Sequence, residues 1–261
     1  MTPDEILAHQ PRILTQAQRE RYFATGFLAA EGLIPADWLR RLCELSEMFL
    51  DRSRSLSASD EAFDLGADHG PQRPHVKFHS SKLNYKWPGA GEIVKWHQDI
   101  PAWPHTNYSP VTLGVYLDDV PAEQGPLTCV AGTHRGPIFV HRDAAGTWTG
   151  AIGDDDMATV PIERSADLTG PAGTVITINC RTVHGSRANA TNRVRAVALF
   201  VYSSADAFAW MPAPTPTPHT GDIVRGGMAA FAHLDPTPCP VPPDWARQGY
   251  GSIFTAQQAE D

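Results

Sequence analysis

Hydrophobic residues in the first fifth of the chain recur at helical spacing. Thr15 and, three residues later, Gln18 form a capping-box pattern ahead of QRERYFATG, which predicts a helix ending at Gly26. The following FLAAEGLI is typical of a short strand. A second helix is predicted to begin at Pro35 and to end near Asp51. The apolar face of this helix consists of Trp38, Leu42, Leu45 and Phe49.

From about residue 76 the pattern changes to the period of two that is typical of β-strands. The apolar runs, separated by glycine and proline, are VKFHSSKLNYK, VTLGVYLDDV, PLTCVAG, GTVITINC and RVRAVALFVYS. Helices followed by many short strands predict a mainly β fold with flanking helices, built as an antiparallel barrel or a double-sheet jelly roll.

Prolines crowd residues 211–243, and we expect this segment to be extended on the protein surface. No internal repeat divides the sequence. We therefore expect a single domain over residues 1–261. Its parts are amino-terminal helices at about 15–51, a β core at about 76–205 and a proline-rich carboxy-terminal segment at about 211–261.

Composition narrows the functional classes. The 261 residues are 42% hydrophobic, enough for a substantial core, while the net charge of −8 and the lack of a Lys/Arg cluster argue against nucleic acid as a partner. The opening MTPDEILAHQ has neither part of a secretory signal, and no apolar run reaches the roughly 18 residues of a membrane span. The four cysteines form no CxxC pair and are interpreted as free thiols. We expect a cytoplasmic protein without a membrane partner; the sequence does not indicate its oligomeric state.

His97 and Asp99 stand two residues apart in VKWHQDIPAW, a spacing that places both on one face of a strand. The run GTVITINC leads on to His184 at the end of a predicted strand. Two imidazoles and one carboxylate suit Fe(II) and leave coordination positions open for oxygen chemistry. An H-x-D pair alone also arises as an ordinary polar strand end, so the distal histidine makes the difference.

Arg195 lies eleven residues after His184, in a predicted strand whose two faces are otherwise apolar. A buried guanidinium needs an anion to offset its desolvation. A dicarboxylate ligand meets that need through bidentate pairing. The alternative is an internal salt bridge with an aspartate or glutamate, and Arg193, which has the same parity, is a second candidate for the role.

The segments WHQD, EQGPLTCVAGTHRGP and VHGS, with Arg195, resemble the phytanoyl-CoA dioxygenase (PhyH) family of Fe(II)- and 2-oxoglutarate-dependent oxygenases. GFLAAEGLIPADWLRRL and FHSSKLN are similar to this family as well, so the resemblance spans roughly residues 20–205. It implies a double-stranded β-helix core of the cupin-like jelly-roll type. The chain after about residue 210 departs from the family pattern.

The same resemblance implies the cofactors Fe(II), 2-oxoglutarate and O2, and a role for individual residues. The implied iron ligands are His97, Asp99 and His184. The far carboxylate of 2-oxoglutarate is implied to bind Arg195, assisted by Ser186, and Asn84 matches an asparagine that contacts the co-substrate in some relatives.

The implied reaction is oxidation of an aliphatic C–H bond in a small metabolite or natural-product intermediate, most directly by hydroxylation. Asp99 fills the position at which related halogenases have a small residue. A first alternative is oxidative cyclisation or desaturation of a natural product, sugar-bearing ones included, in a bacterial biosynthetic pathway of secondary metabolism. A second is a cupin-like module that binds a ligand without turnover.

Residues near the motifs are candidates for contact with the substrate. Trp103, His105 and Tyr108 follow the H-x-D pair, and we expect them at the pocket mouth; packing of these aromatics on the barrel is the equal alternative. Arg73, in the Ser-, Asp- and Gly-rich stretch of residues 52–75, belongs to a candidate lid. Asp206 follows the Arg195 strand, so it is expected at the opening unless it is simply a solvated acid.

The remaining histidines are not expected to bind a metal. His134 and His141 are expected in surface or turn positions. His75 and His79 have the spacing of a helical ligand pair, but the surrounding VKFHSSKLN alternates like a strand, which argues against a second metal site.

Overall fold

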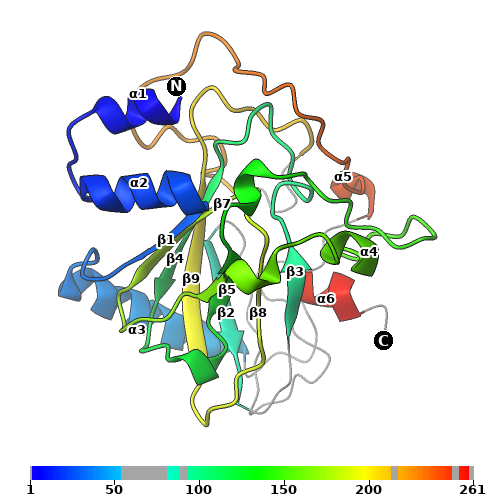
Figure 1. Ribbon diagram of the computed structural model, residues 1–261. Helices are drawn as coiled ribbons and strands as arrows, with labels where there is room; N and C mark the ends of the chain where they lie inside the picture. The colour runs from blue at the N-terminus through cyan, green and yellow to red at the C-terminus, as the bar shows by residue number, and fades with distance from the viewer. Residues whose placement is uncertain (1, 54–80, 89–92, 213–216, 249–252, 259–261) are drawn as a thin grey trace.

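Two antiparallel β-sheets form the centre of the computed structural model, which describes residues 2–53, 81–88, 93–212, 217–248 and 253–258 (Figure 1). The five-stranded sheet has the order β1 (Phe27–Ala30), β7 (Val175–Asn179), β4 (Val111–Tyr116), β9 (Arg195–Tyr202) and β2 (Ser81–Lys86). The four-stranded sheet has the order β3 (Val94–His97), β8 (His184–Ser186), β5 (Leu127–Val130) and β6 (Ser165–Asp167). This arrangement agrees with the predicted jelly-roll core.

Apolar side chains from both sheets meet in one core between them. Ile176, Ile178 and Val197 come from the five-stranded sheet, and Cys129 comes from the four-stranded sheet. Each fully buried large apolar side chain stabilises the fold by about 1.5–3 kcal/mol. This packing holds the two sheets at a fixed separation. It thereby fixes the positions of the side chains that project from the ends of the strands.

The helices α1 (Pro3–Ala8), α2 (Gln16–Thr25) and α3 (Ala36–Ser53) precede most of the strands in the chain. The predicted capping box begins α2: the Gln18 amide donates to the Thr15 hydroxyl at 3.2 Å, and the Thr15 amide donates to the Gln18 side chain at 2.8 Å. Gly26 ends this helix at φ 90°, where a glycine is needed. Helix α1, begun by a capping box at Thr2, was not predicted.

Helix α3 packs on the outer face of the five-stranded sheet through Leu39, Leu42 and Cys43. The predicted apolar face was partly wrong, because Trp38 and Leu45 are 57% and 49% exposed. The buried side chains Leu39, Leu42 and Cys43 follow the spacing i, i+3 and i+4. The buried face therefore begins at Leu39 and not at the predicted Trp38.

Short elements complete the described chain. They are the α-helices α4 (Asp154–Met157), α5 (Trp245–Gln248) and α6 (Ile253–Gln258), and the 3-10 helices η1 (Ala122–Gln124), η2 (Thr133–Arg135) and η3 (Ile162–Arg164). The described residues of the proline-rich segment 211–243 have neither helix nor strand. All four cysteines are free thiols, as predicted. In the described part of the chain, every helix is too short or too polar to cross a bilayer.

Candidate metal and co-substrate site

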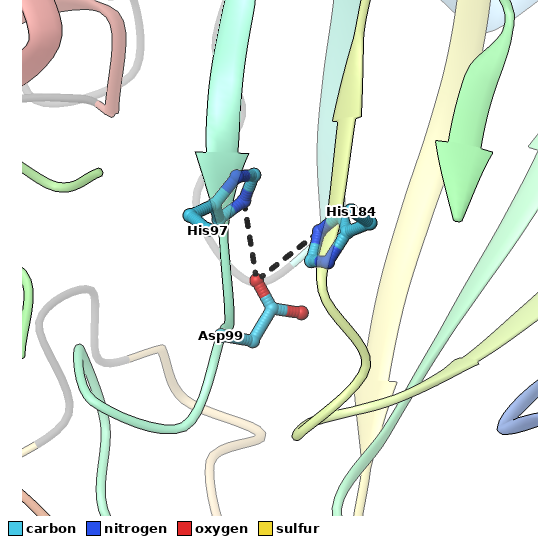
Figure 2. Close-up of side chains that lie close together, drawn as sticks. All are labelled: His97, Asp99 and His184. Carbon is cyan, nitrogen blue, oxygen red and sulfur yellow. Dashed lines mark ion pairs between the residues drawn. The ribbon is translucent and has the colours of Figure 1, made fainter. Parts of the chain in front are cut away.

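His97, Asp99 and His184 lie together at the end of the four-stranded sheet (Figure 2). Nε2 of His97 is 3.8 Å and Nε2 of His184 is 3.7 Å from Oδ1 of Asp99. One ligand atom from each side chain lies within 4.8 Å of the others, and among the described residues this is the one such cluster of three. The three residues that the sequence predicts as ligands are thus brought together.

The strands deliver these side chains differently from the sequence prediction. His97 is the last residue of β3 and faces His184 as its partner in the pairing of β3 with β8. His184 opens β8 rather than ending the preceding strand, and Asp99 lies in a bend after β3 rather than on the strand itself. The bend turns the carboxylate back between the two imidazoles, where Figure 2 shows it.

Hydrogen bonds orient each member of the triad. Nδ1 of His97 is 2.9 Å from the Lys95 carbonyl oxygen, and Nδ1 of His184 is 2.9 Å from that of Thr182. A carbonyl only accepts, so both Nδ1 atoms carry the proton and both Nε2 lone pairs remain for a metal. The Thr112 hydroxyl donates to Oδ2 of Asp99 at 2.9 Å, which leaves Oδ1 facing the imidazoles.

The charge states also fit a divalent metal. Burial, reinforced by the neighbouring His184, holds the pKa of His97 well below 6.5. His97 is therefore neutral at physiological pH, which is the form that ligates metals. Neutral imidazoles and one carboxylate form the donor set that Fe(II) oxygenases use. The residues present thus fit an Fe(II) ion.

Arg195 lies in the same pocket, buried to 2% exposure. Its Nη2 donates to Oδ1 of Asn84 at 2.7 Å, a contact made between neighbouring strands β9 and β2. Among the described residues, Nε of Arg195 and Oγ of Ser186 are buried and have no hydrogen-bond partner. Burial lowers the pKa of Arg195 to about 10, so the guanidinium is still charged at neutral pH.

The alternatives for the arginine can be compared with this geometry. No acidic side chain among the described residues forms a salt bridge with Arg195, which disfavours the internal ion pair. Arg193 is exposed, and its Nη1 lies 4.0 Å from Oδ1 of Asp118 on the surface. A buried guanidinium with no acidic partner and with an unbonded Nε, beside a buried hydroxyl that has no partner among the described residues, is suited to a carboxylate ligand.

One pocket connects the triad and Arg195. Besides these residues its wall includes Lys82, Gln98, Ala102, Trp103, Thr112, Trp148 and Ile253. Apolar side chains from both sheets close its floor, among them Leu127, Ile178 and Val197. The pocket therefore offers a dry, partly apolar volume beside a cationic end.

Of the residues predicted to contact substrate, Trp103 lines this pocket. His105 and Tyr108 do not, because the loop turns both away: Nδ1 of His105 is 2.8 Å from the Trp103 carbonyl oxygen, and the Tyr108 hydroxyl donates to Thr237 at 2.5 Å. Asp206 is also outside, where it accepts a hydrogen bond from the Ser204 hydroxyl. Arg73, the candidate lid at 52–75 beyond residue 53, and the pair His75 and His79 lie outside the described residues.

The sequence prediction missed His141 as a pocket residue. It is 1% exposed rather than at the surface, and its Nε2 accepts the Gln98 amide proton at 3.3 Å. Burial lowers its pKa to about 3, so the ring is neutral and its proton is on Nδ1. The sequence offered one signal for its burial: His141 comes two residues after the apolar Phe139, so in an extended segment the two side chains lie on the same, buried side. His134, by contrast, lies in η2 as expected of a turn residue, with Nε2 3.1 Å from the Phe23 carbonyl oxygen.

Gln98, between His97 and Asp99 in the chain, is completely buried and holds three segments together. Its side chain donates to the carbonyls of Pro137 and Arg181 at 3.0 and 2.7 Å, and accepts from the Phe139 amide at 2.9 Å. No motif marks such a residue, because its role depends on backbone groups from distant parts of the chain.

Comparison with known proteins decides the family. The family model described as phytanoyl-CoA dioxygenase (PhyH) matches residues 35–197. The chain belongs to the phytanoyl-CoA dioxygenase family. It is 33% identical over 225 residues to a probable alpha-ketoglutarate-dependent hypophosphite dioxygenase of Stutzerimonas stutzeri, covering 85% of this chain and 77% of that one. It is 32% identical over 149 residues to the ectoine dioxygenase of Halomonas elongata, covering 51% and 44%.

Solved structures of similar proteins have the same fold. EctD from S. alaskensis, crystallised with 2-oxoglutarate and 5-hydroxyectoine, superposes with a TM-score of 0.63 at 20% identity, over 87% of this chain and 89% of that one. The carbocyclase SnoK from nogalamycin biosynthesis superposes with a TM-score of 0.56 at 20% identity, over 75% and 86%. These likenesses confirm the double-stranded β-helix. The PhyH-family protein is an Fe(II)- and 2-oxoglutarate-dependent dioxygenase, so the binding-module alternative is wrong.

Proposed function

We propose that His97, Asp99 and His184 hold the Fe(II) ion, and that Arg195, Ser186 and Asn84 hold 2-oxoglutarate. The observation that carries this proposal is the meeting, in one pocket, of the His-Asp-His cluster with two buried polar atoms, Arg195 Nε and Ser186 Oγ, that lack a partner in the described part of the chain. A dicarboxylate has one end for each half of such a site. The Ser186 hydroxyl and the Arg195 guanidinium together complete the anion end.

The protein's own contribution is to orient and to exclude water. When bound, iron and 2-oxoglutarate supply the activation of O2, with succinate as the co-product. Thr112 keeps Asp99 in one orientation, and the carbonyls of Lys95 and Thr182 keep both imidazole rings in one tautomer. Apolar residues such as Ile178 keep the reacting centre dry, which limits wasteful side reactions.

The substrate proposed for this site is a small molecule with an oxidisable aliphatic C–H bond, and the proposed outcome is hydroxylation. Trp103 and Trp148 on the pocket wall offer flat apolar surfaces against which an aliphatic group can lie. Oxidative cyclisation or desaturation is the alternative outcome, because the same residues serve all three reactions and the pose of the substrate selects among them.

A second candidate function is oxidation of a P–H bond in a small phosphorus oxyanion. A relative 33% identical over 85% of the chain is named a hypophosphite dioxygenase. The presence of Lys82 on the pocket wall, in addition to Arg195, favours an anionic substrate. Hypophosphite is small enough to share the pocket with the co-substrate.

The test is an assay of the purified protein with Fe(II), 2-oxoglutarate and O2. Hypophosphite, L-proline and ectoine are supplied separately, and succinate is quantified. Hydroxylation appears as a gain of 16 mass units, desaturation or cyclisation as a loss of 2, and P–H oxidation as phosphite in the phosphorus NMR spectrum. Substrate-dependent succinate that survives in His184→Ala would contradict the proposed ligands.

A further inference from the structure

The carboxy-terminal helix α6 packs directly against β3, the strand that ends in His97 (Figure 1). It lies beyond residue 197, where the family match ends. Ile253 at its start lines the pocket, and Ala256 sits so close to Gly150 that a Cβ at Gly150 would lie 3.3 Å from the Ala256 Cβ. A segment distant in sequence therefore forms part of the pocket wall.

Gln257 anchors this helix with a side chain that is 2% exposed. Its Oε1 accepts the Lys95 amide proton at 2.8 Å, and its Nε2 donates to the Gly150 carbonyl at 3.0 Å. Nε2 also lies 3.4 Å from the Lys95 carbonyl oxygen, a longer contact. One buried carboxamide thus joins β3 to the segment that carries Trp148, and this docking supports the proposal that residues 1–261 form one domain.

The Lys95 peptide groups link this anchor to the proposed metal ligand. The same Lys95 carbonyl that Gln257 approaches accepts the Nδ1 proton of His97 at 2.9 Å. That bond fixes the ring orientation and leaves Nε2 for the metal. Displacement of Lys95 would therefore rotate or tilt His97 without touching it.

We propose that Gln257 is a positioning residue of the iron site: it fixes the Lys95 main chain, which in turn orients His97. This inference rests on the proposed role of His97 as an iron ligand. Groups that orient a ligand in this way change metal affinity by about 10- to 100-fold when removed. Gln257→Ala should therefore raise the dissociation constant of the metal at least about tenfold, although residue 257 does not reach the metal cluster.

The experiment measures binding of Co(II), an air-stable probe of an Fe(II) site, by visible absorption in the 261-residue chain. Gln257→Ala is compared with Gln257→Glu, which keeps the acceptor for the Lys95 amide but loses both donors, and with Gln10→Ala as an exposed control. We expect a loss for alanine and also for glutamate, because the second glutamate oxygen would face the Gly150 carbonyl, and no loss for the control. Ala256→Gly, which removes the methyl group packed against Gly150 but keeps the carboxamide, should leave Co(II) affinity within about threefold.

Hydrogen exchange supplies a readout that does not depend on a metal. In the wild-type protein the Lys95 amide should exchange slowly, and Gln257→Ala should speed it. Fast exchange of Lys95 in the wild type overturns the proposal even if the alanine variant fails to fold. Unchanged Co(II) affinity in Gln257→Ala, or an equal loss in Ala256→Gly, also overturns it. His184→Ala distinguishes failure of the ligand assignment from failure of the role of Gln257. If His184→Ala still binds Co(II), the proposed ligands are wrong. If His184→Ala loses Co(II) while Gln257→Ala keeps wild-type affinity, only the proposed role of Gln257 is refuted.

Discussion

Replacement of Arg195 by alanine tests the co-substrate site separately from the metal. Arg195 is buried, its Nη2 is bonded to Asn84, and its Nε has no partner among the residues that the structure describes. Because the guanidinium does not contact the three proposed ligands through any hydrogen bond or ion pair, its loss should leave metal affinity little changed. Its loss should weaken 2-oxoglutarate binding strongly.

The expected magnitude follows from burial. Removing one partner of a desolvated, hydrogen-bonded charge pair costs about 2–5 kcal/mol. At about 1.4 kcal/mol for each factor of ten, the dissociation constant of 2-oxoglutarate should rise by about 30-fold to several thousand-fold. Arg195→Lys keeps the charge but loses the planar fork that reaches both Asn84 and a carboxylate, so an intermediate loss is expected.

The assay is an anaerobic titration of the visible charge-transfer band that forms when 2-oxoglutarate binds the Fe(II) protein. Arg193→Ala is the matched control, since Arg193 is two residues away but exposed near Asp118. A wild-type titration curve for Arg195→Ala would refute the dicarboxylate site. Weakening by Arg193→Ala alone would mean that the pairing of β9 is displaced by two residues.

Three further outcomes are expected. Thr112→Val, which removes the hydrogen bond to Asp99, should raise the dissociation constant for Co(II) about tenfold, and Thr112→Ser should not. Gly26→Ala should lower the free energy of unfolding, measured in urea, by about 2 kcal/mol or more, because φ is +90° and the added Cβ would lie 2.6 Å from His134. Gly32→Ala should lower this free energy less, because φ is +69° there but no atom lies within 4 Å of the added Cβ. Burial lowers the pKa of His134 in the folded protein below 6.5, the ordinary value that the unfolded chain retains. The unfolded chain therefore binds a proton at His134 at higher pH than the folded protein does, and the stability falls as the pH drops below about 6.5. His134→Gln should lessen that fall in the metal-free protein.

Local sequence patterns were sufficient for the elements whose causes are local. The cap at Thr15 and the stop at Gly26 depend on neighbouring residues only, and both were predicted with their boundaries. The period-two runs predicted the longer strands but not β6, because Ser165–Asp167 is too short and too polar to carry that period. The pairing of β2 with β9, which brings Asn84 to Arg195, depends on the topology of the sheet and was not predicted. The family resemblance implied only that both residues contact 2-oxoglutarate.

The parts of the site that escaped prediction depend on contacts between distant segments. Gln257 reaches Lys95 across 162 positions of sequence, and neither residue belongs to a motif. His141 was assigned to the surface because a lone histidine in a Gly- and Pro-rich loop is commonly exposed, whereas here the loop folds it against Gln98. A pattern of residue types predicts which chemistry is present; which backbone groups orient it is decided only when strands and loops assemble.

Because the proposed site is divided between two sheets, the supply of iron and 2-oxoglutarate would affect how long the chain stays folded. His97 and His184 belong to the four-stranded sheet, while Arg195 and Asn84 belong to the five-stranded sheet. If these residues hold iron and 2-oxoglutarate as proposed, the bound co-substrate would bridge the sheets and would bind only when they are packed together. At ligand concentrations 100 times the dissociation constant, such a bridge would add about 2.7 kcal/mol to the free energy of unfolding. The chain without iron and 2-oxoglutarate would then be the form that unfolds first and that proteases degrade first.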